Sequence, residues 1–321
     1  MTSLRADLPV QALRLLHLAT GAHPHGLGHL GAASGLVRLG RRLFVVADDE
    51  HHLGSFDLDG DSPVQLHRLR EHDLPAADAA RKSAKPDLEV LLHLPPELAG
   101  PHGALLALGS GSGPRRNGAM KLPLDAEGRP TGSVQALSLE PLYTPLREHF
   151  GDLNIEGGFF DGDVLVLLQR GNRSGTPNAS LRYGPAQVSD WLAGGTAGAL
   201  PQVRTFELGQ VDGVTLAFTD GTALAGGRWA FSAVAEDSAD SWADGACVGA
   251  VVGIVDAAGR IVTQRRLQPT CKVEGITARE VGGEVELLMV TDADDPAVPA
   301  RLVRARRPAP AAADPAPPSR Q

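Results

Sequence analysis

A short acid–glycine step recurs along the chain, each time just before an apolar run of strand length. "IEGG" carries Glu156, "VEGI" carries Glu274 and "VDGV" carries Asp212, whereas Glu89 in "PDLEV" lacks the glycine and Ser34 in "ASGL" lacks the acid. These five markers lie 55, 67, 56 and 62 residues apart. Repeats of this length exceed a helical solenoid unit and are typical of a four-stranded propeller blade.

Each marker is followed by further segments with strand character. The first is continuously apolar, the second often ends in Asp-Gly or Asp-x-x-Gly turn chemistry, and the third alternates with polar residues. They are residues 42–48, 54–60 and 63–70; 103–110, 118–128 and 133–140; 163–171, 179–184 and 202–208; 228–237, 249–259 and 261–268; and 285–294 with 300–307. The pattern predicts an all-β fold with four strands in each blade.

The fifth repeat has no alternating strand after residues 300–307, but residues 9–18, "PVQALRLLHL", match that pattern. We therefore expect the N-terminal strand to complete the last blade and close the ring, which leaves only short outer edges. Five markers and five outer strands predict a five-bladed β-propeller.

The 67-residue interval between Glu89 and Glu156 keeps six blades as the alternative, because it could contain a degenerate unit. Residues 139–153 have apolar positions at helical spacing, with Pro145 near the first turn, so we expect a helix to fill the interval. Residues 185–195 begin at a proline and end at glycines, which predicts a second short helix.

The chain is expected to form one propeller domain over residues 1–307, followed by a Pro/Ala-rich tail at 308–321 that lacks core-forming residues and is predicted to be disordered. The N-terminal segment has no long apolar core, and no run reaches the length of a membrane span. Cys247 and Cys271 make neither a disulfide framework nor a zinc site. We expect a cytoplasmic monomer, and the net charge of −8 argues against a nucleic-acid partner.

Blades that open on "IEG", "VDG" and "VEGI", with a last repeat "VEGITAREVGGEVELLMVTDADDP", resemble bacterial phytase-like propellers, the group described as having esterase-like activity of phytase. Propellers of the strictosidine synthase and gluconolactonase type are related, and the pattern is also similar to an uncharacterised bacterial family. The resemblance covers roughly residues 10 to 305. It implies a propeller fold, and acids at the marker positions that bind metal.

The marker acids Glu89, Glu156, Asp212 and Glu274 are expected to converge at one rim, because the innermost strand of each blade lines the central channel. Carboxylates held close together repel one another, and Ca²⁺ would relieve this by taking six to eight oxygen ligands. The alternative is that each acid accepts hydrogen bonds from neighbouring-blade amides. Ser34 interrupts the ring of acids.

Three further acidic stretches follow the apolar runs of their blades, "ADDE" at 47–50, "AEDSADSWADG" at 235–245 and "TDADDP" at 291–296. They could add metal ligands, or they could be solvated loop acids. Neither "DLDGDS" nor "TDADDP" has the glycine and closing glutamate of an EF-hand loop.

Basic residues accompany the same motifs and predict a site for a small-molecule anion or ester. Lys85 precedes "PDLE", Lys272 precedes "VEG" and Arg170 ends an apolar run, while "GSGSGPRRNGA" places Arg115 and Arg116 on a glycine-rich loop. Glycines let backbone amides face an anion, and arginine binds phosphate in a bidentate manner. The alternative is an ordinary hairpin loop with solvated arginines.

A set of histidines could also bind a metal, although the spacing matches no known motif and we favour ordinary loop histidines. They are His23, His25 and His29 in "HPHGLGH", with His51 and His52. No G-x-S-x-G elbow occurs, so a serine hydrolase mechanism has no support.

By resemblance, the sequence predicts a metal-assisted hydrolase of a phosphate ester or related ester. The alternative is a non-catalytic propeller that binds a small ligand or a protein at its channel mouth. Fold alone does not decide between the two functions.

Overall fold

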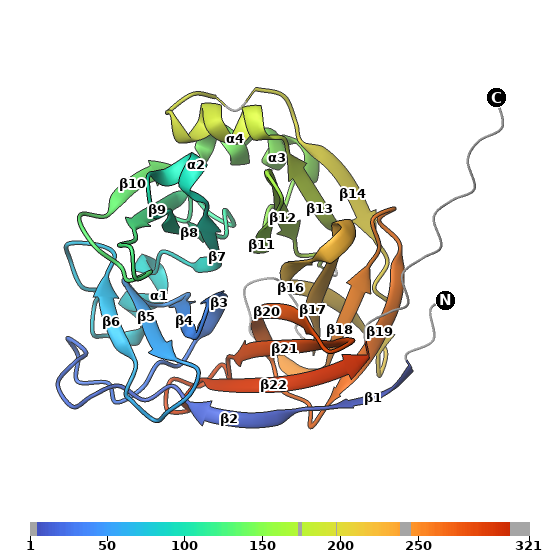
Figure 1. Ribbon diagram of the computed structural model, residues 1–321, viewed down its shortest axis with the longest axis horizontal. Helices are drawn as coiled ribbons and strands as arrows, with labels where there is room; N and C mark the ends of the chain where they lie inside the picture. Colours follow the sequence, from blue (N-terminus) through green and yellow to red (C-terminus); the bar gives the residue numbers. More distant parts are fainter. Residues whose placement is uncertain (1–4, 173–174, 197, 238–244, 309–321) are drawn as a thin grey trace.

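Five β-sheets stand around a central axis and close into a ring, so the chain folds as a five-bladed β-propeller (Figure 1). The structure is a computed structural model, and it describes residues 5–172, 175–196, 198–237 and 245–308. The prediction of an all-β, five-bladed propeller is confirmed, and six blades is wrong. The predicted disordered tail beyond Pro308 lies outside the described residues.

The first three blades each contain four antiparallel strands that are consecutive in the chain. Blade 1 consists of β3 (Ala33–Leu39), β4 (Arg42–Ala47), β5 (His52–Asp57) and β6 (Gln65–Arg68). Blade 2 consists of β7 (Leu88–Leu94), β8 (Ala104–Gly109), β9 (Gly118–Pro123) and β10 (Gln135–Ser138), and blade 3 of β11 (Ile155–Asp161), β12 (Val164–Gln169), β13 (Asn178–Tyr183) and β14 (Gln202–Phe206). The continuously apolar runs form β4, β8 and β12, which are buried along almost their whole length.

The last two blades share the N-terminal segment. Blade 4 consists of β16 (Val214–Leu224), the 3₁₀ turn η1 (Ala225–Gly227), β17 (Arg228–Asp237), β18 (Ala246–Val255) and β19 (Ile261–Gln268), with β15 (Gln210–Val211) added beside β16 and β1 (Arg5–Pro9) beside β19. Blade 5 consists of β20 (Val273–Val281), β21 (Glu284–Thr291), β22 (Arg301–Pro308) and β2 (Gln11–Leu15).

The N-terminal strand closes the ring as predicted. Strand β2 runs antiparallel to β22, with Gln11 opposite Arg304 and Leu15 opposite Arg301. The sequence did not indicate that the preceding β1 pairs in parallel with β19 of blade 4. The amide of Val10, between the two strands, donates to the carbonyl oxygen of Gln268 at 2.7 Å. One continuous segment therefore holds blades 4 and 5 together.

The described residues form four α-helices in connections between strands (Figure 1): α1 (Asp78–Ala84), α2 (Pro96–Ala99), α3 (Glu140–Phe150) and α4 (Pro185–Leu192). The two predicted helices are α3 and α4, and α3 fills the long interval between the second and third markers. Tyr143 of α3 is fully buried and donates its hydroxyl hydrogen to the carbonyl oxygen of Gly109 at 2.8 Å. This contact fixes α3 on blade 2.

The marker positions are β-bulges in the innermost strands. The pairing register of β7, β11 and β20 shifts around Glu89, Glu156 and Glu274 respectively. In two of these blades, the glycine that follows makes close inter-blade contact. A β-carbon on Gly275 would lie 2.7 Å from the carbonyl oxygen of Ser34 in the next blade. The acid–glycine step thus combines a bulge with close packing of inner strands.

The placement of Asp212 at the start of the inner strand of blade 4 is wrong. Asp212 and Gly213, both with positive φ, form the two-residue turn between β15 and β16. Asp-Gly is the preferred sequence for such a hairpin turn, so it imitates the marker pattern. The bulge of β16 instead surrounds Thr219, and the acid–glycine step of this blade is Asp220–Gly221.

Candidate functional site at the channel mouth

One end of the ring gathers charged side chains from all five blades. We call this cluster the acidic mouth: Asp48, Asp87, Glu89, Glu156, Glu236, Glu274, Asp292 and Asp294, with Lys85, Arg116, Arg170 and Lys272. The acids lie just before or at the beginning of the inner strands, or at and after the ends of the second strands, where the chain crosses the same end of the ring. The bulges direct Glu89, Glu156 and Glu274 into this cluster.

Glu156 lies within interaction range of two other predicted marker acids, Glu89 and Glu274. Glu156 raises the pKa of both Glu89 and Glu274, after burial, which is the largest cause in each case. Asp212 lies elsewhere. Its side chain is 67% exposed and pairs with Arg266 of the outer strand β19 at 3.3 Å. The expected ring of four acids is therefore wrong in its blade-4 member.

Arg170 and Lys272 connect the acids of blades 3, 4 and 5. Arg170 Nη1 lies 3.2 Å from Glu156 Oε2, and its other terminal nitrogen pairs with Glu236. Lys272 Nζ lies 2.9 Å from Glu236 Oε1 and 3.4 Å from Glu274 Oε1, and it also pairs with Asp294. Burial opposes ionisation of Glu236, but its two cationic neighbours bring its pKa below the ordinary range.

Lys85 and Arg116 form a second group with the acids of blades 1 and 2. Lys85 Nζ pairs with Asp48 and lies 3.0 Å from Asp87 Oδ1. Arg116 Nη1 lies 2.9 Å from Asp87 Oδ2 and donates to Ser112 Oγ at 2.7 Å. Arg115, the other predicted arginine of this loop, is exposed and donates to the carbonyl oxygen of Ser83 at 3.3 Å. Four of the five predicted basic residues therefore reach the mouth, and each is engaged by carboxylates.

Carboxylates outnumber cations in the acidic mouth by eight to four, a formal excess of four negative charges when all are ionised. Burial is the main cause that raises the pKa of Asp48 to about 6 and that of Asp292 to about 7, and neighbouring acids add to both shifts. Burial and neighbouring acids also raise the pKa of Glu89 and Glu274 well above the ordinary range. Without another cation, the mouth relieves its charge by keeping protons.

The best arrangement for a metal ion is formed by Asp48, Asp87 and Glu89, each of which offers a carboxylate oxygen within 4.8 Å of the others. An all-oxygen donor set of acids suits a hard cation such as Ca²⁺ or Mg²⁺. Glu89 has neither a hydrogen bond nor an ion pair among the described residues, and Glu274 Oε2 is buried with no hydrogen-bond partner there. These side chains fit a divalent cation.

Sequence reasoning identified some of these residues and missed others. The acidic stretches after the second strands supply Asp48, Glu236, Asp292 and Asp294, so their common position in the blades was the useful signal. Asp87 was missed, because it precedes the marker and no other blade repeats it there. Its φ of 56° is an uncommon backbone conformation for a residue other than glycine, and the sequence did not indicate it.

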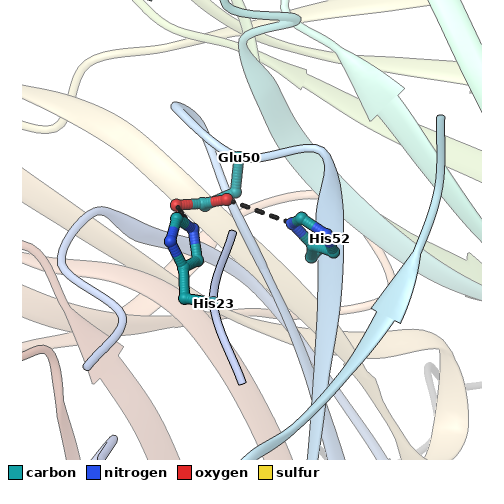
Figure 2. Close-up of side chains that lie close together, drawn as sticks. All are labelled: His23, Glu50 and His52. Carbon is teal, nitrogen blue, oxygen red and sulfur yellow. Dashed lines mark hydrogen bonds and ion pairs between the residues drawn. The ribbon is translucent and has the colours of Figure 1, made fainter. Parts of the chain in front are cut away.

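The predicted histidine set does not gather around one point. His23 and His52 lie on either side of Glu50 (Figure 2), with His23 Nε2 at 3.0 Å from Oε1 and His52 Nδ1 at 3.3 Å from Oε2. His29 bonds the carbonyl oxygen of Pro296, and His51 bonds that of His72. His25 bonds the carbonyl oxygen of Leu74, so His23 and His52 share a partner and the other three histidines each have their own.

The His23–Glu50–His52 cluster is built for hydrogen bonding rather than for a metal. His23 Nδ1 accepts the backbone N–H of His25 at 3.1 Å, so the neutral ring carries its proton on Nε2 and donates it to Glu50. A histidine that binds a metal through one ring nitrogen usually donates the N–H of the other ring nitrogen. In His23, Nδ1 accepts the N–H of His25 and so has no hydrogen to donate. Burial opposes ionisation of Glu50, but the two histidines hold its pKa at about 2.

A five-bladed propeller with a buried acidic mouth is the class of protein that the fold and site define. Within it, the chain belongs to the Family of unknown function (DUF6929), whose family model matches residues 29–306. No curated protein sequence matches the chain. The narrower resemblance to phytase-like propellers stays a prediction.

Several solved propellers are similar to the chain over nearly its whole length. They include XC5397 from Xanthomonas campestris, described as a gluconolactonase (12% identity, 97% of this chain and 99% of that chain, TM-score 0.40). Others are the α-L-arabinofuranosidase Arb93A from Fusarium graminearum (6% identity, 92% and 97%, TM-score 0.44) and a glycosyl hydrolase from Bacteroides ovatus (11% identity, 95% and 95%, TM-score 0.43). Likeness at this level identifies no activity. Among the described residues, none of the helices combines the length and apolar character needed to span a membrane.

Proposed function

We propose that the protein is a metal-assisted hydrolase of an ester, with Asp48, Asp87 and Glu89 as the residues that hold the cation. The observation that carries this proposal is that no described residue forms an ion pair with the Glu89 carboxylate. Burial, followed by the neighbouring acids, raises the pKa of this carboxyl group. A divalent cation would give this carboxylate the counter-charge that six of the other seven acids of the mouth already have.

In the mouth, the carboxylates would bind the cation, and the neighbouring basic and hydroxyl side chains would hold those carboxylates in place. Lys85 already lies on Asp48 and Asp87, so it would hold those two carboxylates in place for the cation. Arg116 and Ser112 fix the other oxygen of Asp87. A bound Ca²⁺ would polarise the ester oxygen and lower the pKa of a bound water molecule.

The charge of the mouth bears on the substrate. Lys85, Arg116, Arg170 and Lys272 are all paired with acids, and the cluster as a whole is negative. A phosphate ester would therefore be repelled until a cation is bound, whereas an uncharged ester or lactone would not. Phosphate esters remain in the proposal as substrates that require the cation for binding as well as for reaction.

The test is turnover by purified, chelator-treated protein with and without added Ca²⁺. p-Nitrophenyl acetate, a simple lactone and p-nitrophenyl phosphate would serve as the three probes. Calcium-dependent hydrolysis that is lost in Glu89→Gln and retained in Asp212→Asn supports the proposal, because Asp212 is exposed beside the outer strand. Absence of calcium-dependent turnover with every probe would contradict it.

The second candidate is a non-catalytic propeller that binds a ligand at the mouth. The observation in its favour is that all four cationic side chains of the mouth are tied into ion pairs, which makes the cluster a cross-link between blades. Calcium binding without turnover of any probe would favour this reading.

A further inference from the structure

Asp220 is a buried carboxylate that touches three backbone amides and no charged group among the described residues. It lies in β16, the inner strand of blade 4, and is only 4% exposed. Its Oδ1 accepts the N–H groups of Gly158 at 3.2 Å and Gly221 at 2.7 Å, and its Oδ2 accepts the N–H of Ile276 at 2.9 Å. Both oxygens accept hydrogen bonds from these N–H groups, which oppose the rise that burial causes in the pKa of Asp220.

The two donors outside β16 belong to the neighbouring blades and lie close in sequence to the mouth acids. Gly158 is in β11 of blade 3, two residues after Glu156. Ile276 is in β20 of blade 5, two residues after Glu274. One side chain therefore connects the inner strands that carry two acids of the mouth.

We propose that Asp220 is a positioning residue, which holds β11 and β20 at the spacing that places Glu156 beside Arg170 and Glu274 beside Lys272. It would not bind a cation itself, because amides already occupy both of its oxygens. Its effect on calcium binding rests on the proposed function, whereas its effect on the two acids does not.

A parallel contact on the other side of the ring supports this role. Ser34, the marker of blade 1, donates its hydroxyl hydrogen to the carbonyl oxygen of Leu88, next to Glu89 in blade 2. The two blades whose inner strands carry no acid of the mouth thus use Ser34 and Asp220 to bond the neighbouring inner strands. Each of these two side chains bonds a backbone group that lies one or two residues from an acid of the acidic mouth.

Close packing adds to the constraint on blade 3. A β-carbon on Gly157 would lie 2.5 Å from the Cα of Asp220, so no side chain separates β11 from β16 at this point. Strands in such close contact transmit a small displacement of one backbone to the other. The position of Glu156, one residue earlier, is therefore sensitive to the amide bonds of Asp220.

The test compares Asp220→Asn with Val234→Ala. Asparagine keeps the shape but must turn an NH₂ group toward at least one of the three amide N–H donors, which removes at least one hydrogen bond. Val234 is a fully buried residue of β17, so its truncation weakens the core of the same blade without touching these amides. Crystal structures of both variants would show whether the Arg170–Glu156 and Lys272–Glu274 pairs survive.

The expected result is loss of one or both pairs in Asp220→Asn and retention of both in Val234→Ala. Because Glu156 is the neighbouring acid that acts most strongly on Glu89, one of the three proposed cation ligands, calcium titration calorimetry should then give a Kd about tenfold weaker for Asp220→Asn only, which corresponds to about 1.4 kcal/mol. Intact pairs in Asp220→Asn would overturn the positioning role, whatever the calcium result. Lost pairs in a protein whose wild type binds no calcium would support the positioning role and defeat the proposed function. If Asp220→Asn does not fold, Asp220→Ser, which keeps one acceptor oxygen, takes its place.

Discussion

An ideal β-carbon on Gly157 would lie 2.5 Å from the Cα of Asp220, closer than any real pair of such atoms. Gly157 belongs to blade 3 and Asp220 to blade 4, so the glycine is where two inner strands come together. This contact explains why a glycine follows an acid in front of a strand. The acid occupies the bulge that points to the mouth, and the glycine lets the next blade approach.

Gly157→Ala should destabilise the protein by about 1–3 kcal/mol, because the nearest atom that the new methyl group meets, the Cα of Asp220, belongs to the backbone and cannot turn away. Chemical denaturation would measure the change in the free energy of unfolding. Gly28→Ala is the control, because a β-carbon there would meet nothing within 4 Å and its φ is not positive. Equal stability of the two variants would contradict the close contact.

Glu89→Gln should remove most of the rise in melting temperature that Ca²⁺ produces in the wild type. The variant keeps the shape of the side chain but loses a charge that no described residue pairs with, on one of the three residues proposed to hold the cation. At a calcium concentration 100 times Kd, the stabilisation that would be lost is about 2.7 kcal/mol. Differential scanning calorimetry with calcium or with chelator would measure it.

Glu156→Gln should also reduce the calcium shift, but with a different effect on the metal-free protein. Glu156 pairs with Arg170, so its loss leaves that guanidinium with Glu236 alone and destabilises the fold by about 1–3 kcal/mol. Asp212→Asn is the common control and should match the wild type with and without calcium. A calcium shift that survives Glu89→Gln and Glu156→Gln would exclude the mouth as the cation site.

Much of the architecture could be predicted from the sequence because the blades share the same local sequence pattern. The apolar runs, turn residues and alternating outer strands depend on local chemistry, and the match of residues 9–18 to the outer strands revealed the closure. Blade 4 was misplaced for a local reason too. Asp212–Gly213 is a genuine turn signal, and the inner-strand step at Asp220 lacks the apolar residue before the acid that the other blades show.

The mouth was harder to predict because its contacts join residues far apart in the sequence. Placing Lys85, Arg170 and Lys272 near the acids was correct, but the sequence did not reveal that acids neutralise each of them. Whether a basic residue is free for an anion depends on the count of acids around it. The acids around one basic residue come from different blades, so their number is known only when the ring is assembled.

Deletion of residues 1–15 should sharply destabilise the protein. It removes β1 and β2 and uncovers β22, whose Leu302 and Val303 are buried in the intact blade. Exposure of either side chain costs about 1.5–3 kcal/mol. Thermal unfolding followed by circular dichroism would measure the loss, with deletion of residues 309–321 as the control because it leaves every described strand in place. An unchanged melting temperature for the first deletion would contradict closure by β2.

Stability of the calcium-free protein should have a maximum between two titration windows. The pKa of Glu50 falls from its ordinary 4.5 to about 2 in the folded protein. A lowered pKa stabilises the fold above pH 4.5, and this contribution is lost as the pH falls toward 2. On the acid side, the free energy of unfolding should therefore rise with pH.

On the neutral side, the direction reverses. The pKa of Asp292 rises from 3.8 to about 7, and that of Asp48 from 3.8 to about 6, chiefly because both are buried. Between pH 4 and 7 the folded protein holds protons that the unfolded chain has released, so the free energy of unfolding falls as the pH rises. The slope is about 1.4 kcal/mol per pH unit for each proton involved.

Urea denaturation at pH 3, 4.5, 6 and 7.5, with chelator and then with Ca²⁺, would test both windows. With chelator, stability should be highest near pH 4.5 and should decline toward pH 7.5. Calcium should flatten that decline, because a cation replaces the protons as the counter-charge of the mouth, and Asp292→Asn should reduce the slope in chelator. His23→Gln should flatten only the acid limb, since His23 is one of the two donors that keep the Glu50 carboxylate ionised. A calcium-free protein that gains stability steadily from pH 4.5 to 7.5 would show that the acids of the mouth are ionised and already compensated, and would remove the electrostatic reason for a bound cation.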